Sequence, residues 1–96
     1  MKAVYHASLA NGSKAEELLK KDDQVSRGSI TLVLASSLGI KEAGYFIIVD
    51  ADENVLAKAD QLLQDVAKRY EQGQEVLNKL QEQEQKAMEG FGSILG

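Results

Sequence analysis

From Asp52 to Glu89 the chain has the composition of one long helix, and this stretch limits the possible folds more than any other. The stretch contains no proline, and apolar residues recur at steps of three and four from Leu56 to Ile94, the spacing of a helix–helix contact. A continuous helix of this length would measure about 57 Å, whereas a domain of this size is about 30 Å across. The helix must therefore project from the body or fold back. Gly73 permits a break, and oppositely charged residues four apart on both sides of it favour projection.

Three segments that precede this stretch have the pattern of β-strands. Residues 2–9 alternate between two faces, with Leu9 on the more apolar one. Residues 28–35 are rich in β-branched side chains. Residues 45–50, with the sequence YFIIVD, are the most continuously apolar, so this segment is expected at the centre of the sheet.

The connections between these strands predict the topology. Ser13 and Glu16 are expected to form a capping box that begins a helix after the first strand, and this helix should end near Asp22. One helical turn that ends at Gly39 is expected between the second and third strands. The strand order 2-3-1 makes every neighbour antiparallel and keeps the crossover right-handed. The predicted fold is α+β: a two-layer β-α-β-β-α arrangement with a three-stranded antiparallel sheet, both helices on one face, and a long C-terminal helix.

The end of the chain, EGFGSILG, is unusually apolar for a segment that follows a run of glutamate, glutamine and lysine. We expect residues 1–72 to form an α+β domain and residues 73–96 to form a helical extension with an apolar tail that docks on another surface. A second possibility is that the tail packs on the protein's own core. The residues expected to form a partner or dimer interface are Leu77, Leu80, Met88, Phe91, Ile94 and Leu95.

Charge argues against tight binding of nucleic acid by this chain alone. The net charge is −4, and residues 51–96 carry five basic and nine acidic side chains, so a broad basic face is not expected. The basic cluster of Lys20, Lys21 and Arg27 is the candidate for a phosphate or RNA contact. Such lysines are usually solvated partners of glutamates four residues earlier on a helix, and both lysines have such a glutamate here.

The sequence offers few groups for catalysis. There is no cysteine and His6 is the single histidine, so no metal site is predicted. Asp50 and Asp52 flank the start of the long helical stretch, where carboxylates cap free N–H groups; a paired-carboxylate active site is the alternative. We therefore expect no catalytic residues, no cofactor and no enzyme activity. No apolar run reaches about 18 residues and the N-terminus is too polar for a secretion signal, which predicts a cytoplasmic protein that does not enter a membrane.

Residues 2–72 resemble a known family in the order of their elements. An arginine leads into a strand, a hairpin follows, an apolar strand ends near DAD, and a leucine-rich helix comes next. This pattern resembles the small dimerising subunit of the KEOPS complex, which makes the threonylcarbamoyl adenosine of tRNA. The resemblance implies a dimer that recruits a kinase-like catalytic subunit. The chain departs from the family in its helix sequence LAKADQLL and in the 25 or so further residues, so a paralogue or accessory subunit is implied.

The sequence therefore predicts a non-catalytic subunit that dimerises, binds another protein subunit and contacts tRNA only within a complex. The alternative is a ferredoxin-like module that binds a small ligand and has a regulatory role. In that case a glycine-lined loop should follow the first strand, and ANGSK is a faint version of one.

Overall fold

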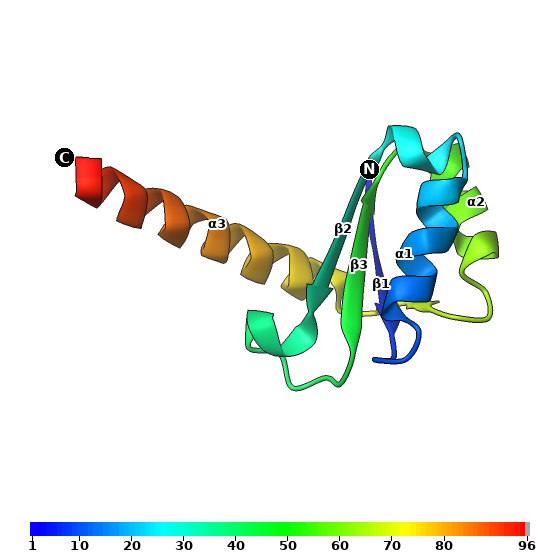
Figure 1. Ribbon diagram of the computed structural model, residues 1–96, viewed down its shortest axis with the longest axis horizontal. Helices are drawn as coiled ribbons and strands as arrows, with labels where there is room; N and C mark the ends of the chain where they lie inside the picture. Colours follow the sequence, from blue (N-terminus) through cyan, green and yellow to red (C-terminus); the bar gives the residue numbers. More distant parts are fainter. Residues whose placement is uncertain (96) are drawn as a thin grey trace.

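The computed structural model describes the backbone of residues 1–95 and the side chains of residues 1–84. Within these residues the chain forms an antiparallel sheet with helices on both of its sides (Figure 1). The elements in chain order are β1 (Lys2–Ala7), α1 (Gly12–Lys21), the short 3₁₀ helix η1 (Val25–Arg27), β2 (Ser29–Leu34), the 3₁₀ helix η2 (Ala35–Leu38), β3 (Tyr45–Asp50), α2 (Glu53–Leu62), β4 (Lys68–Arg69) and α3 (Gly73–Leu95).

The sheet has the order β2-β3-β1-β4, and each pair is antiparallel. The α+β class and the central place of β3 are confirmed. The prediction of three strands is wrong, because β4 adds a fourth strand at the far edge of β1, where Tyr5 pairs with Arg69 and His6 pairs with Lys68. The backbone N–H of Tyr70 extends this pairing by donating to the carbonyl of Val4 at 2.9 Å.

The main core lies between the sheet and the helices α1 and α2. Alternate residues of β1 and β3 face it, as the period of two predicts. Its buried residues are Ala3, Tyr5, Ala7, Ala15, Leu19, Val25, Ile47, Val49, Leu56, Ala59, Leu63 and Ala67. Leu9 was expected on the same face as these β1 residues, but it lies beyond the end of the strand and is 64% exposed.

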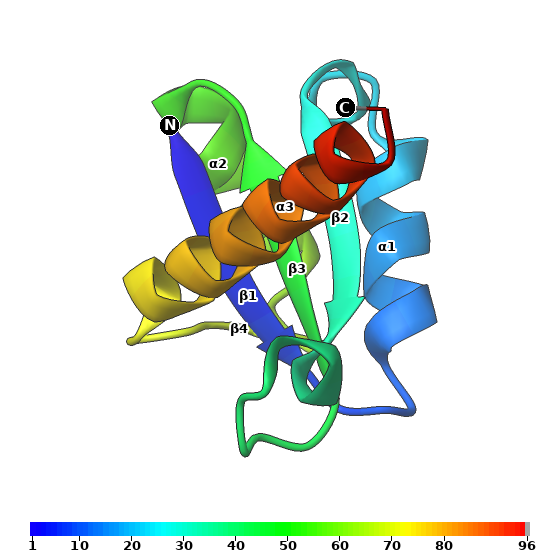
Figure 2. The ribbon, with the colours of Figure 1, turned by 90° about the vertical axis from the view of Figure 1, so that its left-hand side faces the viewer.

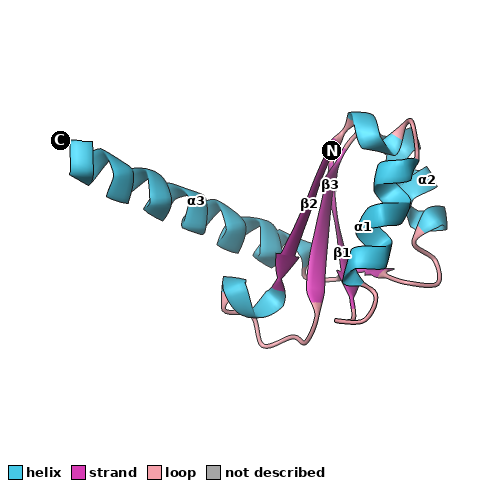
Figure 3. Ribbon diagram, viewed as in Figure 1, coloured by secondary structure: helices cyan, strands magenta, loops and turns pink. Residues whose placement is uncertain are grey.

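A single helix from Asp52 to Glu89, which the spacing predicted, does not form. Helix α2 ends at Leu62, and the chain passes around the edge of β1 as β4 before α3 begins at Gly73 (Figure 3). The reason lies in the tertiary structure, since one straight helix cannot bury residues on both faces of a sheet. Leu63 is buried in the main core, whereas Val76 is buried on the opposite face. β4 satisfies backbone groups of the connecting segment by pairing with β1.

A second, smaller core covers part of the other face of the sheet. Its buried residues are Val4, Ala35, Leu38, Phe46, Ile48 and Val76, and the half-buried Val33, Ile40, Tyr70, Leu77 and Leu80 pack against it. The first turn of α3 lies very close to β1, because a Cβ added at Gly73 would lie 3.2 Å from the Cβ of Val4. The prediction of both helices on one face holds for α1 and α2, but α3 packs on the opposite face, so the arrangement has more than the two predicted layers.

Two local predictions have opposite outcomes. The capping box at Ser13 is wrong: α1 begins at Gly12 with Asn11 as its N-cap, and the cap residue makes no side-chain hydrogen bond. The helical turn that ends at Gly39 is confirmed as η2, and Gly39 adopts the left-handed conformation at a φ of 73°.

Candidate interaction surface

Helix α3 projects from the body of the protein. Figure 1 shows it starting at the sheet and extending away from it, and Figure 2, which looks toward its C-terminal end, shows the same helix in front of the sheet. The longest dimension of the molecule is 46 Å, against 28 and 21 Å for the other two. α3 begins at Gly73 and projects, but the sequence favoured projection of one continuous helix, whereas the helix that projects is separated from α2 by β4.

A cleft of about 550 Å³ lies in the angle between α3 and the second face of the sheet. The sheet contributes Lys2, Ser29, Thr31, Ile48 and Asp50, and α3 contributes Gln74, Leu77, Asn78, Leu80, Gln81 and Glu84. The lining thus has a small apolar part, amides and hydroxyls around it, and one cation with two carboxylates. An apolar side chain of a bound partner can be buried on this surface, while the partner's backbone contacts the surrounding polar groups.

The predicted interface residues are only partly described. Leu77 and Leu80 are half-buried, pack against the second core and also line the cleft. Beyond them, the four residues 81–84 are all exposed, although the side-chain amide of Gln83 donates to the carbonyl of Ser37 in η2. The side chains of Met88, Phe91, Ile94 and Leu95 lie outside the described residues, so their predicted role stays a prediction.

Strand β2 forms an open edge of the sheet. The N–H of Ala35 donates to the carbonyl of Gly44 at 3.0 Å, and hydrogen-bonded pairs alternate along an antiparallel ladder. The backbone groups of Ile30, Leu32 and Leu34 consequently point away from β3. Charged residues and proline usually protect an edge strand from pairing with another chain. β2 contains neither.

The three basic residues proposed for RNA contact do not form one positive patch, because both lysines are in ion pairs and Arg27 lies apart from them. Lys20 pairs with Glu16 at 3.6 Å and Lys21 pairs with Glu17 at 3.0 Å, as the spacing suggested. Arg27 lies separately, in the exposed last residue of η1. The RNA contact stays a prediction, and these glutamates reduce the positive charge that the two lysines present.

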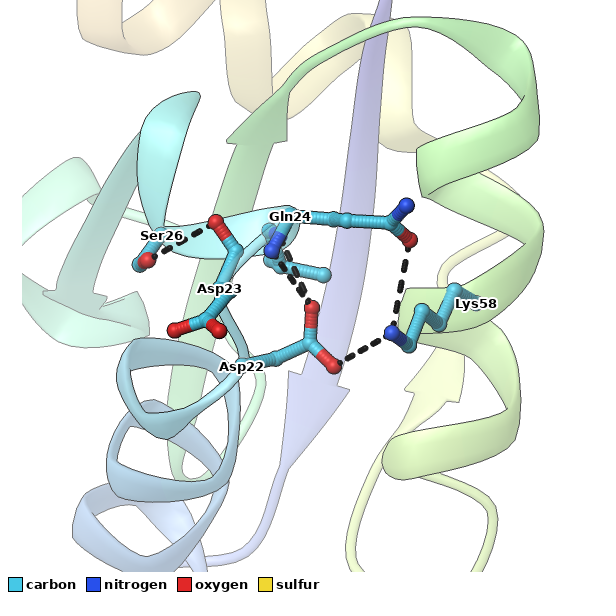
Figure 4. Close-up of polar contacts among 6 residues, drawn as sticks. Asp22, Asp23, Gln24, Ser26 and Lys58 are labelled. Carbon is cyan, nitrogen blue, oxygen red and sulfur yellow. Dashed lines mark hydrogen bonds and ion pairs between the residues drawn. The ribbon is translucent and has the colours of Figure 1, made fainter.

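The segment between α1 and β2 is instead tied to α2 by a polar network (Figure 4). One oxygen of Asp22 accepts hydrogen bonds from the backbone N–H groups of Gln24 and Val25 at 2.9 and 3.0 Å. Its other oxygen pairs with the Lys58 ammonium at 2.9 Å. The same ammonium donates a hydrogen bond to the side-chain oxygen of Gln24 at 3.3 Å. The hydrogen bonds from Lys58 and the two backbone groups hold the pKa of Asp22 below its ordinary value.

A second network joins α2 to β1 and β4. The hydroxyl of Tyr5 donates to Oδ1 of Asp60 at 2.5 Å, and Arg69 binds both oxygens of the same carboxylate at 2.8 and 3.2 Å. Partial desolvation alone would raise the pKa of Asp60, but the hydrogen bonds from Arg69 and Tyr5 outweigh it and lower the pKa. Burial is the main cause that raises the pKa of Tyr5, and the hydrogen bond to Asp60 raises it further.

His6 belongs to an aromatic group beside the second core. Its ring centroid lies 5.5 Å from that of Phe46 and 6.0 Å from that of Tyr70, and the latter two rings are 4.7 Å apart. Its Nε2 lies 2.5 Å from the carbonyl oxygen of Ala43, so this nitrogen carries the proton. The ring therefore packs and donates to the backbone, which is a structural role.

No family model, curated protein or solved structure matches the chain. Among the described residues, no group of three or more histidine or acidic side chains is placed to hold a metal ion. In the same part of the chain, no helix is both long enough and apolar enough to cross a membrane.

Sequence reasoning missed the sheet side of the cleft. Ser29 and Thr31 alternate with apolar residues in β2, so the period of two places them on the face opposite α1. What the sequence did not provide was the break between α2 and α3, which brings Gln74 and Asn78 over that face. With the helix continued to Glu89, these residues would have been assigned to a different surface.

Proposed function

We propose that the chain is a non-catalytic interaction subunit that self-associates and binds a further protein chain. The observation that carries this proposal is that α3 leaves the body, with an open cleft of about 550 Å³ beside it. A helix of 23 residues that touches its own protomer mainly through its first turns provides an extended surface for another chain. Residues 81–84 are all exposed, and the described contact of their side chains with the rest of the protomer is the hydrogen bond from Gln83 to Ser37.

The open edge of β2 supports the same function by a second route. Unpaired backbone groups on an apolar strand favour the addition of a strand from another chain. Leu34 at the end of β2 is 37% exposed. The β2 edge can therefore bind either a second copy or a different subunit. α3 would then bind whichever of these two chains the edge does not.

Truncation after Lys86 tests the proposal. It removes the apolar end of α3 and leaves the described contacts of Val76, Leu77 and Leu80 with the second core in place. We expect the melting temperature to stay nearly unchanged and the affinity for the second copy or for the partner subunit to fall at least about tenfold. A truncated chain that unfolds earlier but associates as before would overturn the proposal and assign the tail to the protein's own core.

The KEOPS complex is the assembly that the sequence resemblance suggests, and membership of it remains a proposal, as does a cytoplasmic location. The proposal predicts that the purified chain binds the kinase-like catalytic subunit of that complex, with tRNA contacted only in the assembled state. Co-elution of the two purified proteins tests it, and separate elution at micromolar concentrations would remove this assembly from consideration.

A regulatory module for a small ligand is the alternative function, and the polar lining of the cleft supports it. Lys2, Thr31 and Asn78 offer a cation, a hydroxyl and an amide within one concave surface. A metabolite panel in a thermal melt separates the two functions. A ligand at 100 times its dissociation constant would add about 2.7 kcal/mol to the free energy of unfolding, whereas an interaction subunit should respond only to its protein partner.

A further inference from the structure

We infer that the cleft beside α3 receives the C-terminal end of α3 from a second copy, in a reciprocal antiparallel arrangement. This inference rests on the proposed function and names the partner of the same surface. Each copy would then use its projecting helix twice, once as a wall of its own cleft and once as the occupant of its partner's cleft.

The size of the possible contacts favours α3 over the β2 edge as the site of self-association. A seam of two six-residue strands is about 20 Å long and one sheet, about 10 Å, thick. It covers about 200 Å² per copy, well below the roughly 800 Å² per partner of a stable interface. Paired α3 helices add a contact along the 23 residues of the helix and also fill the two clefts, so they cover more area than the strand edge does.

The position of the cleft fits the tip of a helix that runs antiparallel to α3. The cleft lies at the base of α3, where Leu77 and Leu80 meet the sheet residues Thr31 and Ile48. An antiparallel partner reaches this base with the last residues of its own α3. Because α3 extends away from the sheet (Figure 1), such a partner can approach along the open side without displacing the second core.

The sequence of α3 also suits an antiparallel pair. Leu77 and Leu80 stand as far before the midpoint between residues 85 and 86 as Ile94 and Phe91 stand after it. An antiparallel pair therefore forms the layers Leu77–Ile94 and Leu80–Phe91 between copies. A parallel pair would instead set each Glu84 against the Glu84 of the other copy, and like charges at such positions are destabilising.

Disulfide trapping between two single-cysteine variants tests the inference, because the chain has no cysteine of its own. Leu80→Cys and Phe91→Cys proteins are mixed, oxidised and analysed by mass spectrometry. We expect mainly the mixed dimer that joins position 80 to position 91, since partners in one layer lie within disulfide reach. Dimers that join position 80 to 80 and 91 to 91 would indicate a parallel pair and would overturn the inference, as would the absence of any trapped dimer.

A variant at the rim of the cleft provides an independent readout that does not alter the core. Asn78 is exposed and lines the cleft, so Asn78→Glu places a charge where the partner helix must bind. We expect sedimentation to show a dimer about tenfold weaker than the wild type. Gln72→Glu adds the same charge outside this cleft and should leave the dimer unchanged. Equal effects of the two variants would argue for general repulsion and against the cleft.

Failure of this inference is distinguishable from failure of the proposed function. A wild-type chain that sediments as a monomer at tens of micromolar and binds no partner subunit would refute the proposed function itself. If the wild type dimerises, the two cysteine variants form no 80–91 disulfide and the Asn78→Glu variant dimerises as tightly as the wild type, self-association is preserved and α3 is removed as its site. In that outcome the cleft is free for a chain other than a second copy.

Discussion

Arg69 in β4 grips the carboxylate of Asp60 in α2 with two hydrogen bonds, at 2.8 and 3.2 Å. The guanidinium of Arg69 also lies 5.4 Å from the centre of the Tyr5 ring, and the Tyr5 hydroxyl donates to the same carboxylate. β1, from the start of the chain, thus meets α2 and β4 at one acidic side chain. This contact holds the chain where it leaves α2 and turns toward the other face of the sheet.

Replacement of Asp60 by alanine should lower the free energy of unfolding by about 1 kcal/mol. The ion pair with Arg69 is half-exposed and therefore screened, so most of the loss comes from the hydrogen bond of the Tyr5 hydroxyl to a charged partner. This corresponds to a fall of about 4–8 °C in melting temperature. Asp65→Ala, at an exposed position nearby, is the control. A double-mutant cycle with Tyr5→Phe should show coupling between the two residues; additive effects would contradict the network.

Stability should fall in acid because two carboxylates are held ionised in the folded state. The pKa values of Asp22 and Asp60 both lie below their ordinary value of 3.8. Just below pH 4 the unfolded chain therefore binds more protons than the folded one, so this stability is present above about pH 4 and is lost as the pH falls through the lowered values. Urea titrations between pH 2 and 7 measure the loss, and Asp60→Asn should flatten the curve. An unchanged slope in that variant would mean that Asp60 does not contribute.

Gly44 should be far less tolerant of alanine than Gly39. Both have positive φ, at 96° and 73°. A side chain at Gly44 would also collide with the backbone carbonyl oxygen of Ala7, whereas nothing lies within 4 Å of one at Gly39. We expect losses of about 3 kcal/mol for Gly44→Ala and about 1 kcal/mol for Gly39→Ala, measured by chemical denaturation. Similar losses at both positions would show that backbone conformation alone decides.

Proline at position 34 should block the β2 edge while leaving the fold intact. Leu34 has a φ of −69°, which proline adopts, and its N–H points away from β3 by the alternation of the ladder. If strand addition at this edge binds a partner subunit, Leu34→Pro should weaken that binding about tenfold with little change in melting temperature. Leu9→Pro, at another exposed leucine outside the strands, serves as the comparison. Undiminished binding by Leu34→Pro would show that this edge is not used.

Local patterns were sufficient to predict the three long strands, their order and the helix between the first two. The apolar run of β3 placed it at the centre, and alternation placed Tyr5 and Val4 on opposite faces of β1. The break after Leu62 was not predictable in this way, because neither glycine nor proline marks it. It depends on contacts made only after folding, namely the pairing of β4 with β1 and the grip of Arg69 on Asp60.

The same limit explains what was predicted of the candidate surface. Leu77 and Leu80 were identified because helical spacing is a local property of sequence. Lys2, Thr31 and Asn78 were not, since they come together only when α3 starts on the second face of the sheet. A concave surface built from four separate segments leaves no spacing signal that a reading along the chain can detect.

The close approach of Gly73 to Val4 has a mechanical consequence for the whole of α3. The helix is about 34 Å long from this contact. A small tilt where α3 meets β1 therefore causes a larger displacement at its far end. A tilt of about 5° at this contact moves the far end by about 3 Å. That displacement is enough to separate a side chain near the far end from the residue that it would contact in a partner. The missing side chain at residue 73 therefore influences the direction of α3 as well as its packing, because a larger residue there would push the start of the helix away from the Val4 side chain.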